Sequence, residues 1–343
     1  MRGKFHILTG PNGAGKTSYL SWLADTTLAQ IRDGHSDYRR VVCLSGTVHD
    51  RYSVGIWSTR TIASDDCVYL GYRTNNNAFS DISPFRSLAL HFLYGKRPAD
   101  RISKSLAAEF MVQLGFKPEM RVTSRRYNGR VQETYVFDFS RDDAPSVAGG
   151  FDSIAGCAIE FARDDRLLSV SHLSSGQKWY LLTILAACFC VHDGSLVVID
   201  EPECSLHPEW QLEIMERYLS ILEKRGVAHT TVISTHSPLV TSSVPNRRSV
   251  LCNLPADAMW RDTVFHGQTA DTVLSSQFGV VSPRSPEVIS LLQAGLHFLA
   301  KGEQGGDAFK EIVDRLRSFN LTLDKDDPLF DAFDTVLTIE GGL

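Results

Sequence analysis

The segment Gly10-Pro11-Asn12-Gly13-Ala14-Gly15-Lys16-Thr17 limits the fold of this chain more than any other feature. Glycine stands at its first and sixth positions, lysine and threonine follow, and every fixed position of the phosphate-binding loop (P-loop) pattern G-x-x-x-x-G-K-[ST] is therefore present. An apolar run at 4–9 precedes the loop, and apolar residues recur at helical spacing from Lys16 to Ile31. The sequence predicts a strand, a P-loop and a helix, in that order.

The chemistry of this loop predicts a nucleoside triphosphate and Mg²⁺ as ligands. Backbone N–H groups at the start of a helix point toward phosphate oxygens, and the positive end of the helix dipole favours anions. We expect Lys16 to reach the β and γ phosphates and the Thr17 hydroxyl to bind Mg²⁺. The predicted nucleotide-binding residues of the loop are Gly10, Pro11, Asn12, Gly13, Ala14, Gly15, Lys16, Thr17 and Ser18.

The second element of such a site lies in the second half of the chain. The apolar run Leu196 to Ile199 is followed directly by Asp200 and Glu201. A buried strand that ends in an acid delivers a carboxylate to the metal beside the phosphates. We predict that Asp200 holds the metal together with Thr17, and that Glu201 polarises the attacking water. An acidic pair at a strand end is common in loops, and its company with the P-loop favours the catalytic interpretation.

Uninterrupted apolar runs indicate the fold class. Residues 41–44, 67–70, 195–199 and 230–233 have the composition of parallel strands covered by helices on both faces. Apolar spacing also predicts an insert and a tail, with helices at 85–93 and 102–114, a hairpin at 120–139 and two helices after Ser285. We predict an α/β fold with a mostly parallel sheet. Its parts are the first part of the P-loop core (1–80), a helical and hairpin insert (81–165), the second part of the core (166–281) and a C-terminal helical segment (282–343).

Composition narrows the functional classes. With 43% hydrophobic residues, the 343-residue chain can bury a sizeable core. No apolar stretch reaches the roughly 18 residues of a membrane span and no leader segment is recognisable, so a cytoplasmic protein without a membrane partner is expected. The seven cysteines lack metal-ligand spacing and fit free thiols in a reducing compartment. A formal charge of -5 gives no overall attraction to nucleic acid.

The segment Leu173-Ser174-Ser175-Gly176-Gln177 (LSSGQ) precedes a predicted helix that runs to about Val191. Small hydroxyl residues and a glycine at the start of a helix form either an ordinary N-cap or a second anion-binding site. The position of the segment shortly before the acidic strand favours the anion-binding interpretation.

The order of these elements resembles that of the ABC-type ATPases: P-loop, long insert, LSSGQ, acidic strand with a second glutamate, and His236 after the next strand. The resemblance covers the core elements from residue 4 to about residue 240. It implies that ATP holds two chains in a head-to-tail dimer, in which the signature of one chain completes the phosphate site of the other. The γ-phosphate of the partner's ATP would then be contacted by Ser174, Ser175, Gly176 and Gln177. It also implies that His236 is the switch histidine, although a histidine at a strand end is otherwise more often structural.

Within that family, residues 200–208 are similar to the D-E-P-E-x-x-L-H-P string of the RecF, SMC and OLD-type branch. The stretches at 44–45, 49–52 and 69–73 resemble stand-alone ATPases of bacterial anti-phage systems of the retron and Septu types. These resemblances imply an ATPase that senses or processes foreign nucleic acid, with a partner nuclease or toxin as effector. Two alternatives stay open: the ATP-driving subunit of a membrane transporter, and an ATP-binding scaffold with little turnover.

Three features depart from the family pattern. Only nine residues precede Gly10, where relatives usually begin with an antiparallel strand pair that carries an adenine-stacking aromatic, so the preference for ATP over GTP rests on the resemblance alone. No glutamine follows the strand at 67–70 as the Q-loop residue, and the candidates for that role are Asn75, Asn76 and Asn77. The insert lacks the long heptad arms of SMC proteins.

Three further groups of residues have a structural and a functional interpretation. A basic cluster in the predicted hairpin is either a solvated face or, with nucleic acid as a partner, a phosphate contact: Arg121, Arg125, Arg126 and Arg130. A solvated loop, rather than a nuclease metal site, is expected for Asp324, Asp326 and Asp327. Core packing, rather than docking of a partner, is expected for Phe309, Ile312, Leu316 and Phe319.

Overall fold

The computed structural model describes residues 5–48, 50–57, 64–75, 78–94, 100–125, 132–141, 157–280, 284–325 and 327–339. The chain divides into two compact units, Met1–Val273 and Leu274–Leu343. The first unit contains both β-sheets. The short helix α8 (Ala270–Gln277) spans the boundary between the units.

The first unit is built around a seven-stranded sheet with the order β11-β10-β1-β9-β8-β2-β3. The strands, in chain order, are β1 (Phe5–Thr9), β2 (Arg40–Ser45), β3 (Cys67–Leu70), β8 (Ser195–Asp200), β9 (His229–Ser234), β10 (Ser249–Asn253) and β11 (Asp257–Asp262). Every neighbouring pair is parallel except β10 and β11, which are antiparallel. The predicted α/β fold with a mostly parallel sheet is confirmed.

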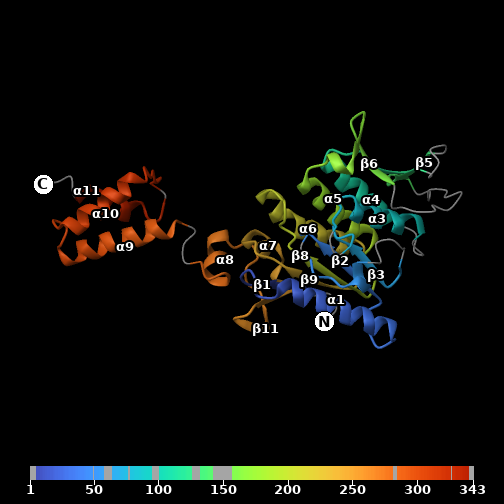
Figure 1. The fold of residues 1–343 in the computed structure, drawn as a ribbon, viewed down its shortest axis with the longest axis horizontal. Coiled ribbons are helices and arrows are strands. Elements are labelled where there is room, and N and C mark those ends of the chain that lie inside the picture. The colour runs from blue at the N-terminus through green and yellow to red at the C-terminus, as the bar shows by residue number, and fades with distance from the viewer. Residues whose placement is uncertain are drawn as a thin grey trace. The chain divides into compact units, whose positions relative to one another are not determined.

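Helices cover both faces of this sheet, which explains why its strands are apolar without alternation. Leu196 and Val198 of β8 pack in the same core cluster as residues of α1 (Lys16–Arg32). Val197 and Ile199 belong to the opposite cluster, with α5 (Ser175–Phe189) and α6 (Pro208–Lys224). Figure 1 shows α1 on one side of the sheet and α5 and α6 on the other. Successive side chains of one strand therefore build two separate cores.

Helix α5 lies inside the protein rather than on its surface. All of its residues after Gln177 are buried, because it packs against α3 (Ser83–Tyr94), α4 (Arg101–Gln113) and α6. Its single basic side chain, Lys178, is paired with Asp81 at 2.5 Å. A helix that is apolar on all sides is stable only when it is surrounded in this way. In the described part of the chain, no helix combines the length and the apolar character that crossing a bilayer requires.

The insert carries a second, antiparallel sheet with the order β5-β4-β6-β7. Its strands are β4 (Glu119–Arg125), β5 (Gln132–Asp138), β6 (Ala158–Arg163) and β7 (Arg166–Ser169). The predicted hairpin is confirmed as β4 and β5, while its expected turn at 128–129 lies outside the described residues. The pair β6 and β7 was not predicted.

The first unit also contains short helical segments. They are α2 (Val54–Trp57), α7 (Pro238–Ser243) and the 3-10 turns Val170–His172 and Asn246–Arg248.

In the second unit, the described residues after α8 form three helices, α9 (Pro286–Lys301), α10 (Asp307–Ser318) and α11 (Phe330–Thr338). The expectation of two helices after Ser285 was wrong, because α11 is only nine residues long and its pattern is interrupted by acidic residues. The expected core role of Phe309 and Leu316 is confirmed, since both side chains are fully buried with Phe333 of α11. Gly302 ends α9 in the left-handed conformation, at φ 73°.

Candidate functional site

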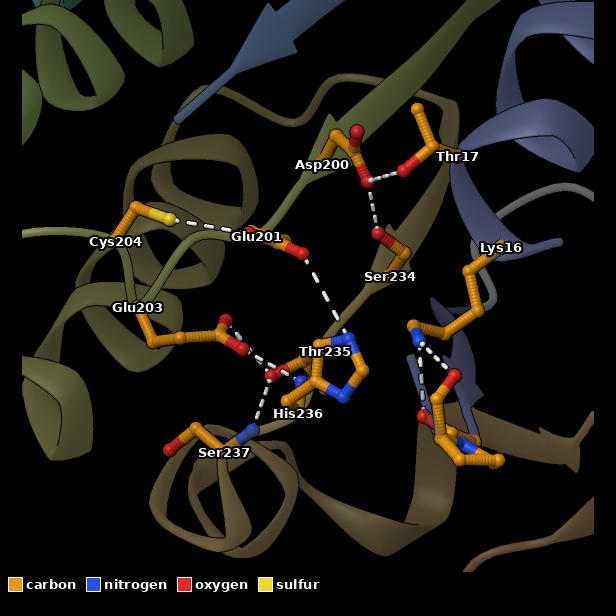
Figure 2. A network of polar contacts seen from close by, with 12 residues as sticks. Lys16, Thr17, Asp200, Glu201, Glu203, Cys204, Ser234, Thr235, His236 and Ser237 are labelled. Carbon is orange, nitrogen blue, oxygen red and sulfur yellow. Dashed lines mark hydrogen bonds and ion pairs between the residues drawn. The ribbon is translucent and has the colours of Figure 1, made fainter. Parts of the chain in front are cut away.

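The predicted site residues of the P-loop and of the acidic strand meet at the carboxyl edge of the main sheet. Leu8 of β1 and Asp200 of β8 are both paired in register with Ser234 of β9. The loops that follow β1, β8 and β9 therefore leave the sheet side by side, as they do at the ligand-binding edge of parallel sheets. Figure 2 shows Lys16, Thr17, Asp200, Glu201 and His236 gathered at this edge.

The P-loop has a backbone that requires glycine. Gly10 adopts φ 136°, and a Cβ placed on it would lie 2.0 Å from the carbonyl oxygen of Leu254. Gly15 caps α1 in the left-handed conformation, at φ 93°, and no side chain caps the helix. A Cβ on Gly13 or Gly15 would meet no atom within 4 Å. The start of α1 thus presents its first N–H groups on an open side, as phosphate binding requires.

Replacing Gly10 with alanine is expected to destabilise the protein more than replacing Gly34, which follows α1. Both residues have positive φ, but Gly34 has open space around it, whereas at Gly10 the Leu254 backbone must move. We expect about 1 kcal/mol for Gly34→Ala and a clearly larger loss for Gly10→Ala. Chemical denaturation of the two variants measures this difference. Equal losses would show that the contact with Leu254 does not constrain the P-loop.

Lys16 is buried, and its ammonium group lies over the loop. Nζ donates to the carbonyl oxygens of Gly10 at 2.8 Å and Pro11 at 3.1 Å. Burial lowers the pKa of Lys16, while nearby carboxylates act in the opposite direction: Glu201, Asp200 and Glu203. A cation surrounded by acids at a helix N-terminus is suited to bind the terminal phosphates of a nucleotide.

Asp200 and Thr17 form an arrangement that a divalent cation fits. Thr17 Oγ1 donates to Asp200 Oδ1 at 3.3 Å, and Ser234 Oγ donates to the same oxygen. The other oxygen, Oδ2, is buried without a hydrogen-bond partner, and burial raises the pKa of Asp200 to about 6. A buried carboxylate oxygen without a donor, beside a hydroxyl group, matches the oxygen ligands that Mg²⁺ prefers. Within the described ranges no three His, Cys, Asp or Glu side chains group into a metal site of their own.

Glu201 and His236 face each other beside this pair. The distance from His236 Nε2 to Glu201 Oε1 is 3.7 Å, and Cys204 Sγ donates to Glu201 Oε2 at 3.2 Å. Glu201 has a positive φ of 52°, and its N–H donates to the carbonyl oxygen of Ser234 at 2.9 Å. Burial, and secondarily the charge of Lys16, lowers the pKa of His236, so its imidazole is neutral at neutral pH. The left-handed backbone turns the Glu201 side chain away from the strand and toward His236.

Two stretches that resemble defence ATPases meet in a buried polar cluster next to this site. Tyr69 OH donates to Asp50 Oδ2 at 2.5 Å, and Arg73 Nη1 donates to the carbonyl oxygen of Asp50 at 3.3 Å. A Cβ on Gly71 would lie 2.3 Å from the Tyr69 hydroxyl, so glycine is needed there. The charge of Asp50 is one of the influences that raise the pKa of Asp200. Sequence reasoning noted both stretches and gave them no role in the site.

Of the three candidates for the Q-loop role, the structure describes Asn75 alone. Asn75 is exposed in a turn, where its N–H donates to the carbonyl oxygen of Ala78 at 3.3 Å. Asn76 and Asn77 lie outside the described residues. A basic side chain that sequence reasoning missed does approach the P-loop, since Arg51 Nη1 donates to Ser18 Oγ at 3.4 Å.

The LSSGQ segment starts α5, and its contacts run to the loop after β8. Ser174 and Gln177 form a capping box, in which Ser174 Oγ accepts from Gln177 N at 3.2 Å. A Cβ on Gly176 would lie 2.7 Å from the carbonyl oxygen of Ser205. The side chains of Ser174 and Ser175 are exposed, and none of the hydrogen bonds made by the described residues joins this segment to residues 10–18. Within one chain, the structure therefore does not bring this segment together with the P-loop.

The basic cluster of the hairpin and the acidic cluster at 324–327 each contain a residue that forms an ion pair. Arg121 is paired with Glu119 at 2.9 Å, while the Arg125 side chain and the rest of the basic cluster lie outside the described residues. The expectation of a solvated acidic loop was wrong for Asp327, because both of its carboxylate oxygens accept from Arg284 at 2.5 Å. Asp326 is likewise not described.

The fold and the site together define an ABC-type P-loop ATPase domain: a mostly parallel sheet, a P-loop before α1, an acidic pair after β8 and the LSSGQ segment at the start of α5. The family model described as "AAA domain, putative AbiEii toxin, Type IV TA system" matches residues 39–242, which is more than half of the chain. The chain belongs to this family.

Individual proteins share less with the chain. Protein ea59 of Escherichia phage lambda is 40% identical over 74 residues, which are 21% of this chain and 14% of the phage protein. The ATP-binding subunit of an ABC transporter is 15% identical, with 81% of this chain and 83% of that chain covered and a TM-score of 0.35. An SMC head bound to the C-terminal winged-helix domain of ScpA is 10% identical, with 76% and 90% covered and a TM-score of 0.36.

Proposed function

We propose that this protein is an ATP-driven switch, which binds Mg-ATP, pairs with a second copy of itself and separates after hydrolysis. The observation that carries the proposal is the convergence of Lys16, Thr17, Asp200, Glu201 and His236 on one edge of the sheet. These side chains lie at or after the carboxyl ends of three different strands. Together they supply a cation for the phosphates, ligands for the metal and a base.

The residues have distinct roles in the proposed reaction. The P-loop N–H groups and Lys16 bind the β and γ phosphates, and Thr17 and Asp200 hold Mg²⁺, which when bound neutralises charge on the phosphate oxygens. Glu201 accepts a hydrogen bond from water and orients it toward the γ-phosphorus. The new bond joins the water oxygen to phosphorus, the bond to the β-phosphate oxygen breaks, and the water's proton passes by way of Glu201 to the released phosphate. His236 lies beside Glu201 and would face the γ-phosphate.

The proposed partner in this cycle is a second copy of the chain. Ser174 and Ser175 are exposed at the start of a helix that is otherwise buried. The buried helix holds them in place, while their side chains stay accessible to a partner. In a head-to-tail pair they, Gly176 and Gln177 would contact the γ-phosphate of the partner's ATP. Such a site exists only while ATP bridges the two chains, which makes the nucleotide a timer for the assembly.

The biological setting that we propose is anti-phage defence in the cytoplasm, with a nuclease or toxin as partner effector. The family description, which names a toxin of a type IV toxin–antitoxin system, supports this setting. The buried cluster of Asp50 and Tyr69 adds support, because it lies in the stretches that resemble defence ATPases. A nucleic acid trigger belongs to the same proposal. Copurification with a membrane protein would favour the transporter alternative instead.

Two measurements test the proposed function directly. Phosphate release from ATP, with and without DNA, measures turnover, and light scattering on a sizing column measures mass with ATP and with ADP. We expect turnover together with a doubled mass in ATP alone. ATP binding without turnover would favour the scaffold alternative, and a constant monomer mass would contradict the paired switch.

Removal of Mg²⁺ by EDTA is expected to abolish turnover. The Mg²⁺ concentration that supports turnover is expected to rise at low pH. Because the pKa of Asp200 is raised to about 6, its carboxylate is ionised at pH 7 and mostly protonated at pH 5. A protonated carboxyl group is a poor metal ligand, so Mg²⁺ affinity is retained above pH 6 and lost below it. The Mg²⁺ concentration for half-maximal turnover should rise roughly tenfold between pH 7 and pH 5. A constant Mg²⁺ requirement would argue against Asp200 as the ligand.

A further inference from the structure

Glu203 lies two residues after the proposed catalytic carboxylate, in the loop that follows β8, and sequence reasoning gave it no role. Its side chain is only partly exposed and points toward the loop that follows β9, as Figure 2 shows. Burial raises the pKa of Glu203, and hydrogen bonds from that second loop oppose the rise. A carboxylate in such a place is costly to bury unless its oxygens have donors.

Both oxygens of Glu203 have donors from consecutive residues. Oε2 accepts from Thr235 Oγ1 at 2.8 Å, and Oε1 accepts from the backbone N–H of His236 at 2.5 Å. Thr235 is fully buried, its N–H donates to the carbonyl oxygen of Leu8 at 3.0 Å, and its Oγ1 accepts from Ser237 N at 2.9 Å. Glu203 thus joins the loop that carries Glu201 to the loop that carries His236.

The pattern of donors fits a carboxylate, which offers an acceptor oxygen to each of them. Thr235 Oγ1 already accepts the N–H of Ser237, so its own proton needs an acceptor, and Glu203 Oε2 provides it. A glutamine at position 203 could still accept from His236 N through its carbonyl oxygen. Its amide group would face the Thr235 hydroxyl with a donor instead of an acceptor, so the Thr235 proton would lose its acceptor. Glutamine has nearly the same shape, which makes it a test of hydrogen bonding alone.

We propose that Glu203 is a positioning residue, which holds the His236 backbone so that its imidazole faces Glu201. The inference rests on the proposed function, because it assigns Glu203 a part in the same hydrolysis. Glu203 does not touch the reacting atoms and acts through His236, whose Nε2 lies 3.7 Å from Glu201 Oε1. The short loop between β9 and α7 is already held at Thr235 N, which donates to Leu8, and at Ser237, which caps α7. The two hydrogen bonds to Glu203 add support between these points, at the residue that carries the imidazole.

The test is a double-mutant cycle on ATP turnover with Glu203→Gln and His236→Ala. If Glu203 acts through His236, Glu203→Gln lowers kcat about tenfold in the wild-type background, with KM for ATP within about twofold, and has little further effect in the His236→Ala background. Equal losses of kcat in both backgrounds would overturn the inference. Glu216→Gln, on the exposed side of α6, is the matched control and should retain wild-type turnover.

A second pair of variants tests the bond from Thr235 Oγ1 to Glu203 without changing Glu203. Thr235→Ser keeps the hydroxyl and should retain turnover, whereas Thr235→Val removes it at nearly constant shape and should lower kcat as Glu203→Gln does. This pair decides the question if Glu203→Gln fails to fold, and equal turnover of the two Thr235 variants would then overturn the inference. Wild-type protein without ATP turnover would instead refute the proposed function, and the role of Glu203 with it.

Discussion

Glu201→Gln is expected to lower ATP turnover by roughly 10² or more while ATP binding persists. Glutamine cannot take the proton of the attacking water, but it has nearly the same size and can keep the left-handed backbone of this position. The P-loop, Thr17 and Asp200 are unchanged, so the nucleotide and its metal still bind. In the proposed cycle the pair separates after hydrolysis, so the variant should remain a dimer in ATP for longer than the wild type does.

Single-turnover phosphate release and nucleotide affinity, measured on the same preparation, separate these two effects. Glu209→Gln is a suitable control, because Glu209 is exposed in the first turn of α6. Wild-type turnover of Glu201→Gln would remove this carboxylate from the catalytic role.

Lys16→Met is expected to weaken ATP binding roughly 10- to 100-fold, as the loss of charge-assisted hydrogen bonds does elsewhere. Methionine fills a similar volume but has no donor for the β and γ phosphates. The carboxylates of Glu201, Asp200 and Glu203, whose charges act on Lys16, would then face the triphosphate without a compensating cation.

Calorimetric titration with ATP measures this loss, and Lys224→Met provides the control. Lys224 is exposed in the last turn of α6, so its replacement should leave ATP affinity unchanged. Retained affinity in Lys16→Met would contradict the assignment of the P-loop as the phosphate site. The two predictions form a pair, because one variant should lose binding and the other only chemistry.

The parts of the site that the sequence predicted are those encoded by contiguous residues. The P-loop is recognisable because its geometry depends on residues that are neighbours in the chain, such as Gly10 before the turn and Lys16 at the start of α1. The acidic strand is recognisable because burial on both faces demands an unbroken apolar run. Each of these signals is local, so no knowledge of the sheet order is needed.

The remaining parts depend on which strands become neighbours. Glu203 and Thr235 are distant in sequence and meet only because β8 and β9 lie side by side. Asp50 and Tyr69 meet for the same reason, since Asp50 follows β2 and Tyr69 lies in the neighbouring strand β3. Helix α11 was not predicted because it is too short to show a long periodic pattern. Its apolar residues pack against α9 and α10, which the sequence alone does not reveal.

The buried position of α5 has a consequence for how the two sites of a pair would communicate. Trp179, one turn into the helix, donates from Nε1 to the carbonyl oxygen of Pro202 at 2.8 Å, and Pro202 directly follows Glu201. Helix α5 is therefore connected to two parts of the proposed site. Its first residues are the serines that would touch a partner's nucleotide, and Trp179 holds the loop of the carboxylate that would act on the chain's own nucleotide. If the start of α5 moves, the loop that carries Glu201 is expected to move with it. We expect the two ATP molecules of a pair to be hydrolysed as coupled events rather than independently.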